Sequence, residues 1–312
     1  MSLDPTRYAT RRATLDSAEI AYVHEGLGGE PLLLLHGFPE TKRIWWRCID
    51  PLVAAGFEVI VPDLRGYGDS GPAIDGFYDP AAMSADMHQL VHHHLGHDNC
   101  AAAAGDLGGV VMYDLGLRYP GFVTRQCFFN SVPPTLPADF YAAAGVTELG
   151  RYHPATSDYF LRQGTDADAL AAELDTPERR ISYIEDFYGH RLWSGPNGFD
   201  AASARFHAEP FADATSLRTS FGPYEAALRT IAASTPARFR ETNPVETLVL
   251  YGPEDHVLPG SFPHRCAVAF PNHMGPFELA GAGHFLQWER AEAFCDLVGA
   301  TLRSGFTWPT RT

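Results

Sequence analysis

The chain has 312 residues, of which 45% are hydrophobic and 20% are charged, and its formal net charge is −15. A chain of this length can bury a full core, so it needs neither a metal nor a disulfide for stability alone. The negative charge argues against nucleic acids and anionic membranes as partners, because both would repel it. The five cysteines are widely spaced and form no Cys-x-x-Cys pair, which predicts a reducing compartment and no thiolate zinc site.

No segment is typical of a membrane protein or a secreted one. Apolar runs fall short of the roughly 18 residues that a membrane span needs, and residues 1–12 lack the apolar region of a signal peptide. The sequence therefore predicts a cytoplasmic protein, and it leaves the oligomeric state open between a monomer and a homodimer.

Buried strands alternate with helices in the first 132 residues. Short strands are expected at 14–20 and 21–25, buried strands near 31–35 and 57–62, helices near 45–53, 80–96 and 108–119, and another strand at 123–131. Residues 99–104 (NCAAAA) are ambiguous, because an alanine run favours a helix by propensity. A strand is due at this place in the alternation, and we predict one.

The pattern changes after residue 132. Residues 133–240 contain aromatic-rich helical stretches and no convincing buried strand, whereas strand character returns at 245–255 and 276–284, with a final helix over 289–302. The predicted fold class is therefore α/β, a mostly parallel central sheet flanked by helices. The core comprises residues 1–132 and 241–312, and residues 133–240 form an inserted helical lid.

Ligands of an open parallel sheet bind at the carboxyl ends of its strands, so the residues that follow each strand are the candidates for chemistry. They form the motifs HGFPE (36–40), DLRGYGDS (63–70), G-D-x-G-G (105–109), Y-G-x-E-D (251–255) and G-A-G-H (281–284). In this order they resemble the motifs of the α/β-hydrolases, and within that superfamily those of the epoxide hydrolase and haloalkane dehalogenase group. The resemblance covers nearly the whole chain, and it is weak in the insertion.

The resemblance implies that Asp106 is a nucleophile on a sharp strand-to-helix turn. Small residues flank it, Ala104 and Gly105 before and Gly108 after, as such a turn requires; the alternative is an aspartate that only caps a helix. A carboxylate is suited to displacement at a saturated carbon, which gives an alkyl-enzyme ester and points to epoxides or alkyl halides as substrates.

Hydrolysis of that ester needs a base, and His284 is the candidate, with Asp255 orienting its imidazole. The alternatives are a loop histidine without a ligand and an aspartate that caps the next helix. Asn130 lies where some relatives carry the acid, but an amide cannot serve as one. The resemblance also implies an oxyanion hole made by the backbone amides of Phe38 and Leu107.

The leaving group separates the two substrate classes. Epoxide hydrolases protonate the opening oxygen with a pair of lid tyrosines, and Tyr224 in SFGPYEAAL matches the second of them, although it could also be a packing tyrosine. Tyr152, His153 and Tyr159 compete for the first position, and we favour Tyr159 together with His153. Leu107 stands where many dehalogenases carry a halide-binding indole, and residues 106–116 lack the arginines of fluoroacetate dehalogenases.

The sequence thus predicts an enzyme without cofactor or metal that hydrolyses a small apolar epoxide with water to a vicinal diol. Its pocket lies between core and lid, and the expected substrate contacts are His36, Phe38, Leu107, Tyr152 and Tyr224. The alternatives are a dehalogenase with the same ester chemistry and a catalytically degenerate ligand-binding homologue. Two further expectations concern side chains outside the site. The histidines at 92–94 and 97 form a solvated helix end, and Arg65 pairs with a core carboxylate.

Overall fold

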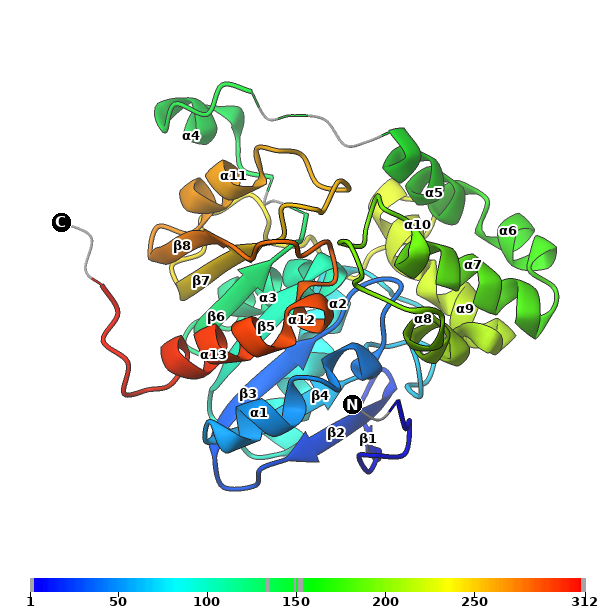
Figure 1. Ribbon diagram of the computed structural model, residues 1–312, viewed down its shortest axis with the longest axis horizontal. Helices are drawn as coiled ribbons and strands as arrows, with labels where there is room; N and C mark the ends of the chain where they lie inside the picture. The colour runs from blue at the N-terminus through cyan, green and yellow to red at the C-terminus, as the bar shows by residue number, and fades with distance from the viewer. Residues whose placement is uncertain (1–2, 133–134, 149, 151–153, 310–312) are drawn as a thin grey trace.

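The computed structural model describes residues 3–132, 135–148, 150 and 154–309, with side chains omitted at 154–157. Its centre is an eight-stranded sheet in the order β1-β2-β4-β3-β5-β6-β7-β8, flanked by helices (Figure 1). Strands β1 and β2 pair antiparallel with their neighbours, and all pairings from β4 to β8 are parallel. The strands are β1 (Arg11–Thr14), β2 (Glu19–Glu25), β3 (Glu30–Leu35), β4 (Phe57–Pro62), β5 (Cys100–Gly105), β6 (Val123–Phe129), β7 (Glu246–Tyr251) and β8 (His273–Glu278). The predicted fold class is confirmed.

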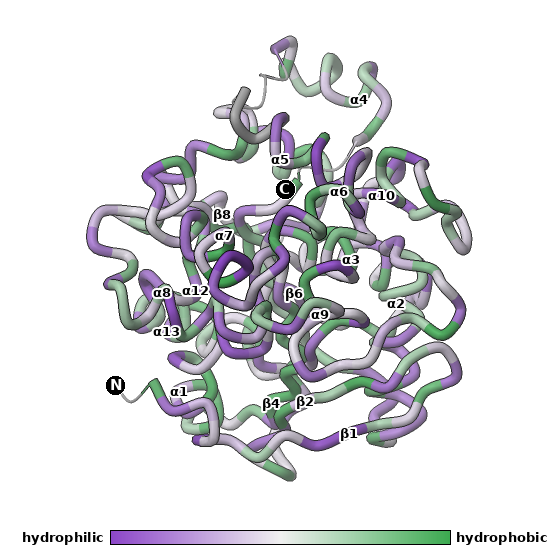
Figure 2. The backbone as a smooth tube through the Cα atoms, turned by 90° about the vertical axis from the view of Figure 1, so that its right-hand side faces the viewer, coloured by the Kyte–Doolittle hydropathy of each residue, from purple (hydrophilic) through white to green (hydrophobic). Residues whose placement is uncertain are grey.

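The alanine run is strand β5, as the alternation predicts. It lies between β3 and β6, and every one of its residues is buried. Tertiary placement overrides helix propensity here, because small side chains let helices pack closely on both faces of the sheet centre. Strand β1 at the sheet edge is polar and largely exposed (Figure 2).

The helices of the core differ from the expected ones mainly at their ends. They are η1 (Lys42–Trp45), α1 (Ile49–Ala54), α2 (Pro80–His88), η2 (Gln89–His94), α3 (Asp106–Arg118), α11 (Phe262–Ala269), α12 (Leu286–Glu289) and α13 (Ala291–Thr301). The helix predicted over 80–96 becomes a π-helical turn from Gln89 onward. The boundary between the first two strands lies at residues 15–18 and not at the predicted 20–21. The amide of Leu15 donates to the carbonyl of Ala18 and closes the turn there.

The regular elements of the insertion are all helices in its described residues, and irregular segments such as 190–200 and 229–240 connect or follow them. Its elements are α4 (Ala138–Ala143), α5 (Pro154–Thr165), α6 (Ala167–Glu173), α7 (Pro177–Gly189), α8 (Ala201–Ala208), η3 (Glu209–Ala212), α9 (Ala214–Ser220) and α10 (Gly222–Leu228). Helices α5 to α10 lie together on one side of the sheet, whereas α4 lies apart from them, beside α11 (Figure 1). The exact domain boundaries stay a prediction.

The predictions for Arg65, the cysteines and membrane spans can be compared with the structure. Arg65 is buried and forms an ion pair with Asp86, with 2.5 Å between Nε and Oδ2, and a second one with Asp75; this prediction is confirmed. All five cysteines are buried and free of disulfides. Within the described part of the chain, no helix is long and apolar enough to cross a membrane.

Candidate active site

The turn from β5 to α3 holds Asp106 in a backbone conformation that few residues adopt. Its φ is +44°, in the left-handed region, where a non-glycine residue is strained. A Cβ on Gly105 would lie 2.5 Å from the Phe129 ring, and one on Gly108 would lie 2.6 Å from the His36 carbonyl oxygen. The small flanking residues therefore allow a sharp turn, and the turn presents the Asp106 carboxylate at the carboxyl edge of the sheet.

Asp106, His284 and Asp255 come together at this edge. The Nε2 atom of His284 lies 3.3 Å from Oδ2 of Asp106, and its Nδ1 atom lies 2.7 Å from Oδ2 of Asp255. The Asp106 side chain is 19% exposed, whereas the other two are 2% exposed. Asp106 can thus be reached from outside, while its two partners are held in the protein. Asp255 also accepts hydrogen bonds from the amides of Val257 and Leu258, so it caps the following turn as well.

The two carboxylates control the charge of His284. Burial favours the neutral imidazole, but the negative charge of Asp255 and then that of Asp106 outweigh it, so the pKa of His284 lies well above its ordinary value. Conversion of Asp106 to a neutral ester removes one of these charges. Without that charge the pKa of His284 would be lower, and the imidazole would be a better base.

The predicted oxyanion donor Phe38 already faces the nucleophile. Its backbone amide donates to Oδ1 of Asp106 at 2.7 Å. Leu107 begins the first turn of α3 beside Asp106 and packs against the core. An amide aimed at a carboxylate oxygen is suited to hold the negative charge that develops on that oxygen when water attacks an ester.

His36 is held by the backbone, and its predicted role as a substrate contact stays a prediction. Its side chain is fully buried, its Nδ1 lies 2.9 Å from the carbonyl oxygen of Gly37, and its Nε2 accepts from the amide of Leu64 at 2.9 Å. Both ring nitrogens are used by the backbone. His36 therefore fixes the loop that carries Phe38.

Asn130 is a positioning residue that the sequence reasoning missed. Its side-chain amide donates to the carbonyls of Gly283 and His284, and its side-chain oxygen accepts from the amide of Gly252. Its backbone carbonyl accepts from the amide of Asp106 at 2.9 Å. Asn130 thus connects the loops of His284 and Asp255 through its side chain and the turn of Asp106 through its backbone carbonyl.

Glu40 was also missed, although it belongs to the HGFPE motif. It is 2% exposed, accepts from the amide of Gly37 at 2.7 Å, and is hydrogen-bonded to the side-chain amide of Gln287. Burial, together with the negative charge of Asp106, raises its pKa to about 7. The carboxyl group supports the oxyanion loop and titrates near neutral pH.

This raised pKa predicts how stability changes with pH in Glu40→Gln. The folded protein binds the Glu40 proton more tightly than the unfolded chain, so between about pH 4.5 and 7 the free energy of unfolding falls as pH rises. Glutamine removes this dependence. The free energy of unfolding of the variant, minus that of the wild type, should therefore be about 3 kcal/mol higher at pH 8 than at pH 4. Urea unfolding at the two pH values measures it, with exposed Glu178→Gln as control; an equal difference at both pH values contradicts the assignment.

Two tyrosines of the insertion lie close enough to Asp106 for its charge to act on them. Tyr159 and Tyr224 are hydrogen-bonded to each other, and their rings lie 5.9 Å apart, centroid to centroid. Burial is the main cause that raises both pKa values well above the ordinary range, and the charge of Asp106 adds to it. Both phenols therefore keep their protons. The ring of Phe38 contacts both of them, which joins the lid to the oxyanion loop. Tyr152 and His153 lie outside the described residues.

A cavity of about 470 Å³ lies beside Asp255 and Asn130, between β7 and α11. Its walls include Tyr251, Leu258 and Phe262, and the described lid helices contribute none of the residues that line it. It therefore differs from the predicted pocket between core and lid, which stays a prediction. Aromatic rings gather where that pocket is expected, namely Phe38, Tyr159, Phe187, Trp193, Phe211 and Tyr224.

A strained turn that presents a carboxylate, a histidine oriented by an acid and an aimed backbone amide are together typical of a hydrolase. Comparison with known proteins agrees with this class. Residues 30–291 match the model of the alpha/beta hydrolase fold family, and the chain belongs to that family.

The similar proteins include several epoxide hydrolases. The chain is 36% identical to the soluble epoxide hydrolase of Corynebacterium sp. (strain C12) over 43% of its own length and 45% of the relative's. It is 25% identical to an epoxide hydrolase of Caballeronia sordidicola over 91% and 90% of the two chains. It is also 33% identical to a fluoroacetate dehalogenase of Burkholderia sp. over 64% of each. Among solved structures, the epoxide hydrolase CorEH without ligand has a TM-score of 0.75 at 22% identity, covering 94% of this chain and 97% of that one, which shows a shared fold.

Proposed function

We propose that the protein hydrolyses a small apolar epoxide to a vicinal diol through a covalent ester on Asp106. One observation carries the proposal: the partly exposed carboxylate of Asp106 lies beside an imidazole and a backbone amide, and its charge acts on two tyrosine phenols. The similarity to epoxide hydrolases supports it.

In the first step, a carboxylate oxygen of Asp106 attacks an epoxide carbon and the C–O bond of the ring breaks. The ring oxygen takes a proton from the hydrogen-bonded pair Tyr159 and Tyr224 and becomes a hydroxyl group. In the second step, His284 takes a proton from water, and the resulting hydroxide attacks the ester carbonyl. The oxyanion is held by the amides of Phe38 and Leu107 and collapses to release the diol. The proton that His284 carries in the free enzyme passes to the tyrosine pair once the ester has formed, and the proton taken from water restores it.

The two phenols favour an epoxide over a halide. An opening epoxide gains a negative oxygen and needs a proton, which a buried phenol with a raised pKa can donate. A departing halide needs N–H donors, and the side chain next to Asp106 is that of Leu107, which has none. The dehalogenase alternative is favoured by one observation, the similarity to a fluoroacetate dehalogenase.

A single-turnover reaction in ¹⁸O-labelled water tests the proposal. With enzyme in excess over styrene oxide, the water attacks the ester carbonyl, so the label should enter the peptide that contains Asp106 and the diol should be unlabelled. Label in the diol alone would show direct attack by water and would contradict the ester. Halide release from haloalkanes or fluoroacetate without epoxide turnover would favour the dehalogenase, and absence of both products would favour a degenerate ligand-binding homologue.

The tyrosine pair can be tested by removing its hydroxyl groups. Either Tyr159→Phe or Tyr224→Phe should lower kcat for an epoxide by about tenfold, because the remaining phenol still donates, and the double variant should lose about 10² to 10³-fold. The measurement is steady-state diol formation, with Tyr183→Phe, a neighbouring lid tyrosine bonded to Gln163, as control. A double variant with wild-type kcat would exclude the pair as the proton donor.

A further inference from the structure

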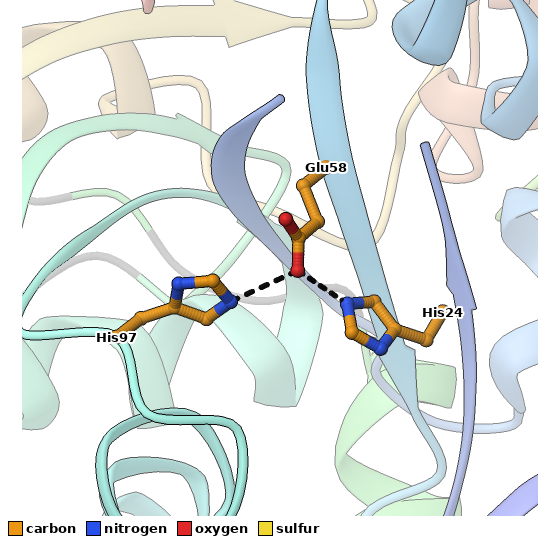
Figure 3. Close-up of side chains that lie close together, drawn as sticks. All are labelled: His24, Glu58 and His97. Carbon is orange, nitrogen blue, oxygen red and sulfur yellow. Dashed lines mark hydrogen bonds and ion pairs between the residues drawn. The ribbon is translucent and has the colours of Figure 1, made fainter. Parts of the chain in front are cut away.

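Three potential metal ligands converge far from the Asp106 site. His24 on β2, Glu58 on β4 and His97 before β5 point their side chains toward one another, and both imidazoles face the same carboxylate oxygen (Figure 3). Nε2 of His24 lies 2.6 Å from Oε1 of Glu58, and Nε2 of His97 lies 3.0 Å from it. The three ligand atoms lie within 4.8 Å of one another.

The fold brings these residues together from distant parts of the sequence. In the antiparallel pair of β2 and β4, His24 lies opposite Ile60, so Glu58 is its diagonal neighbour on the same face. His97 follows the π-helical turn Gln89–His94, and its amide donates to the carbonyl of Val91. His92 fixes the same loop through a hydrogen bond between its Nδ1 and the carbonyl of His97.

We propose that His24, Glu58 and His97 bind a divalent transition-metal ion of the Zn²⁺ type through two imidazole nitrogens and one carboxylate oxygen. Tetrahedral zinc with bonds near 2.0–2.1 Å separates its ligand atoms by about 3.3 Å. The two nitrogen–oxygen distances are 2.6 and 3.0 Å, so the side chains need to open by less than about 1 Å. Three protein ligands leave the fourth position to water.

The surroundings suit such an ion. Glu58 uses its other oxygen, Oε2, to accept from the amide of Gly28 at 2.9 Å, which orients the carboxylate and leaves Oε1 free to bind the metal. His24 and Glu58 are each 6% exposed, while the His97 side chain is 21% exposed and offers an entry path. His24 Nδ1 has no hydrogen-bond partner among the described residues.

The position of the site indicates a structural role. Glu58 lies near the start of β4, and His97 precedes β5, so the trio lies at the amino edge of the parallel strands. The Asp106 site occupies the opposite, carboxyl edge. A bound ion would connect β2, β4 and the loop before β5, and it would stabilise the folded chain without touching the reaction.

Isothermal titration of the untagged, chelator-treated full chain with ZnCl₂ tests the proposal. We expect one saturable site with a dissociation constant in the micromolar range or below. His97→Ala, a change in a partly exposed loop, should raise that constant at least tenfold and abolish the zinc-dependent rise in Tm. His93→Ala is the matched control, because His93 is exposed and lies in the same histidine-rich segment; it should bind zinc like the wild type.

Two further measurements separate the site from other histidines. Co²⁺ added to the wild type should give the visible absorption of a four-coordinate site, and His97→Ala should lack it. Equal zinc binding in the wild type and His97→Ala, or loss of binding in His93→Ala, would overturn the proposal. Turnover of the epoxide by His97→Ala should match the wild type, so this test and that of the proposed function fail independently.

Discussion

Asp106→Asn is expected to lower kcat/KM for an epoxide by about 10⁴-fold or more, since loss of a nucleophile removes the covalent route entirely. The fold should tolerate the change well. Asparagine adopts the left-handed backbone conformation more readily than most residues, and its side-chain oxygen can still accept from the amide of Phe38. The loss would therefore come from chemistry and not from unfolding.

Steady-state diol formation and a thermal melt of the same sample measure the two effects separately. Asp16→Asn, at an exposed position of the β1–β2 turn, is the matched control and should retain full activity. A kcat/KM within tenfold of the wild type in Asp106→Asn would exclude Asp106 as the nucleophile. A large drop in Tm would instead show that the carboxylate is needed for the strained turn.

The members of the Asp106–His284–Asp255 group could be predicted because each follows a strand of the parallel part of the sheet. Parallel strands end at one edge of a sheet, so residues that directly follow them meet there whatever their separation in the sequence. The same reasoning identified the loop of Phe38. It did not show that the side chain of His36 is held by backbone groups, because membership of a motif does not show which way a side chain points.

Positions that depend on three-dimensional partners could not be predicted. Asn130 is bonded to carbonyls 153 and 154 positions away, and Glu40 to an amide 247 positions away. The role of a buried polar side chain depends on its hydrogen-bond partners. These partners are fixed only when the helices and strands pack together. Glu40 carried one signal, its place in the HGFPE motif, but no pattern showed that it would be buried beside Asp106.

The histidine-rich segment shows the same limit. His93 and His94 are exposed, as expected for a solvated helix end. His97 is not part of such an end, because the π-helical turn directs the chain back over the sheet and brings it to Glu58. No sequence pattern connects His97 with its two partners, because the pairing of β2 with β4 brings only His24 and Glu58 together.

His284→Ala is expected to stop the reaction after its first half. Attack by Asp106 needs no base, so the ester should form at a normal rate, whereas its hydrolysis needs the imidazole and should slow by about 10⁴-fold or more. Each active site should then bind one equivalent of substrate, and diol release should end after that. Intact-mass spectrometry after exposure to styrene oxide should show a single addition, which peptide mapping locates on Asp106. A haloalkane tested in parallel identifies which electrophile is accepted.

Asp255→Asn tests the contribution of Asp255 while the imidazole of His284 stays in place. The imidazole remains, but it loses the negative charge that contributes most to raising its pKa and the acceptor that orients its Nδ1–H. We therefore expect an adduct that forms and then decays, more slowly than in the wild type and faster than in His284→Ala. His256→Ala, whose side chain is 53% exposed, is the control and should turn over normally.

The decisive comparison is the rate at which the adduct decays in the wild type, in Asp255→Asn and in His284→Ala. If the charge of Asp106 helps to keep His284 protonated in the free enzyme, ester formation itself converts the imidazole into the base that the next step needs, and removing the imidazole must trap the ester. An adduct on another residue, or none in His284→Ala under conditions where the wild type forms diol, would show that the first bond is not made by Asp106. An adduct that decays at the wild-type rate would show that water is activated by a different group, and Glu40, buried beside Asp106 with a pKa of about 7, is the one the structure offers.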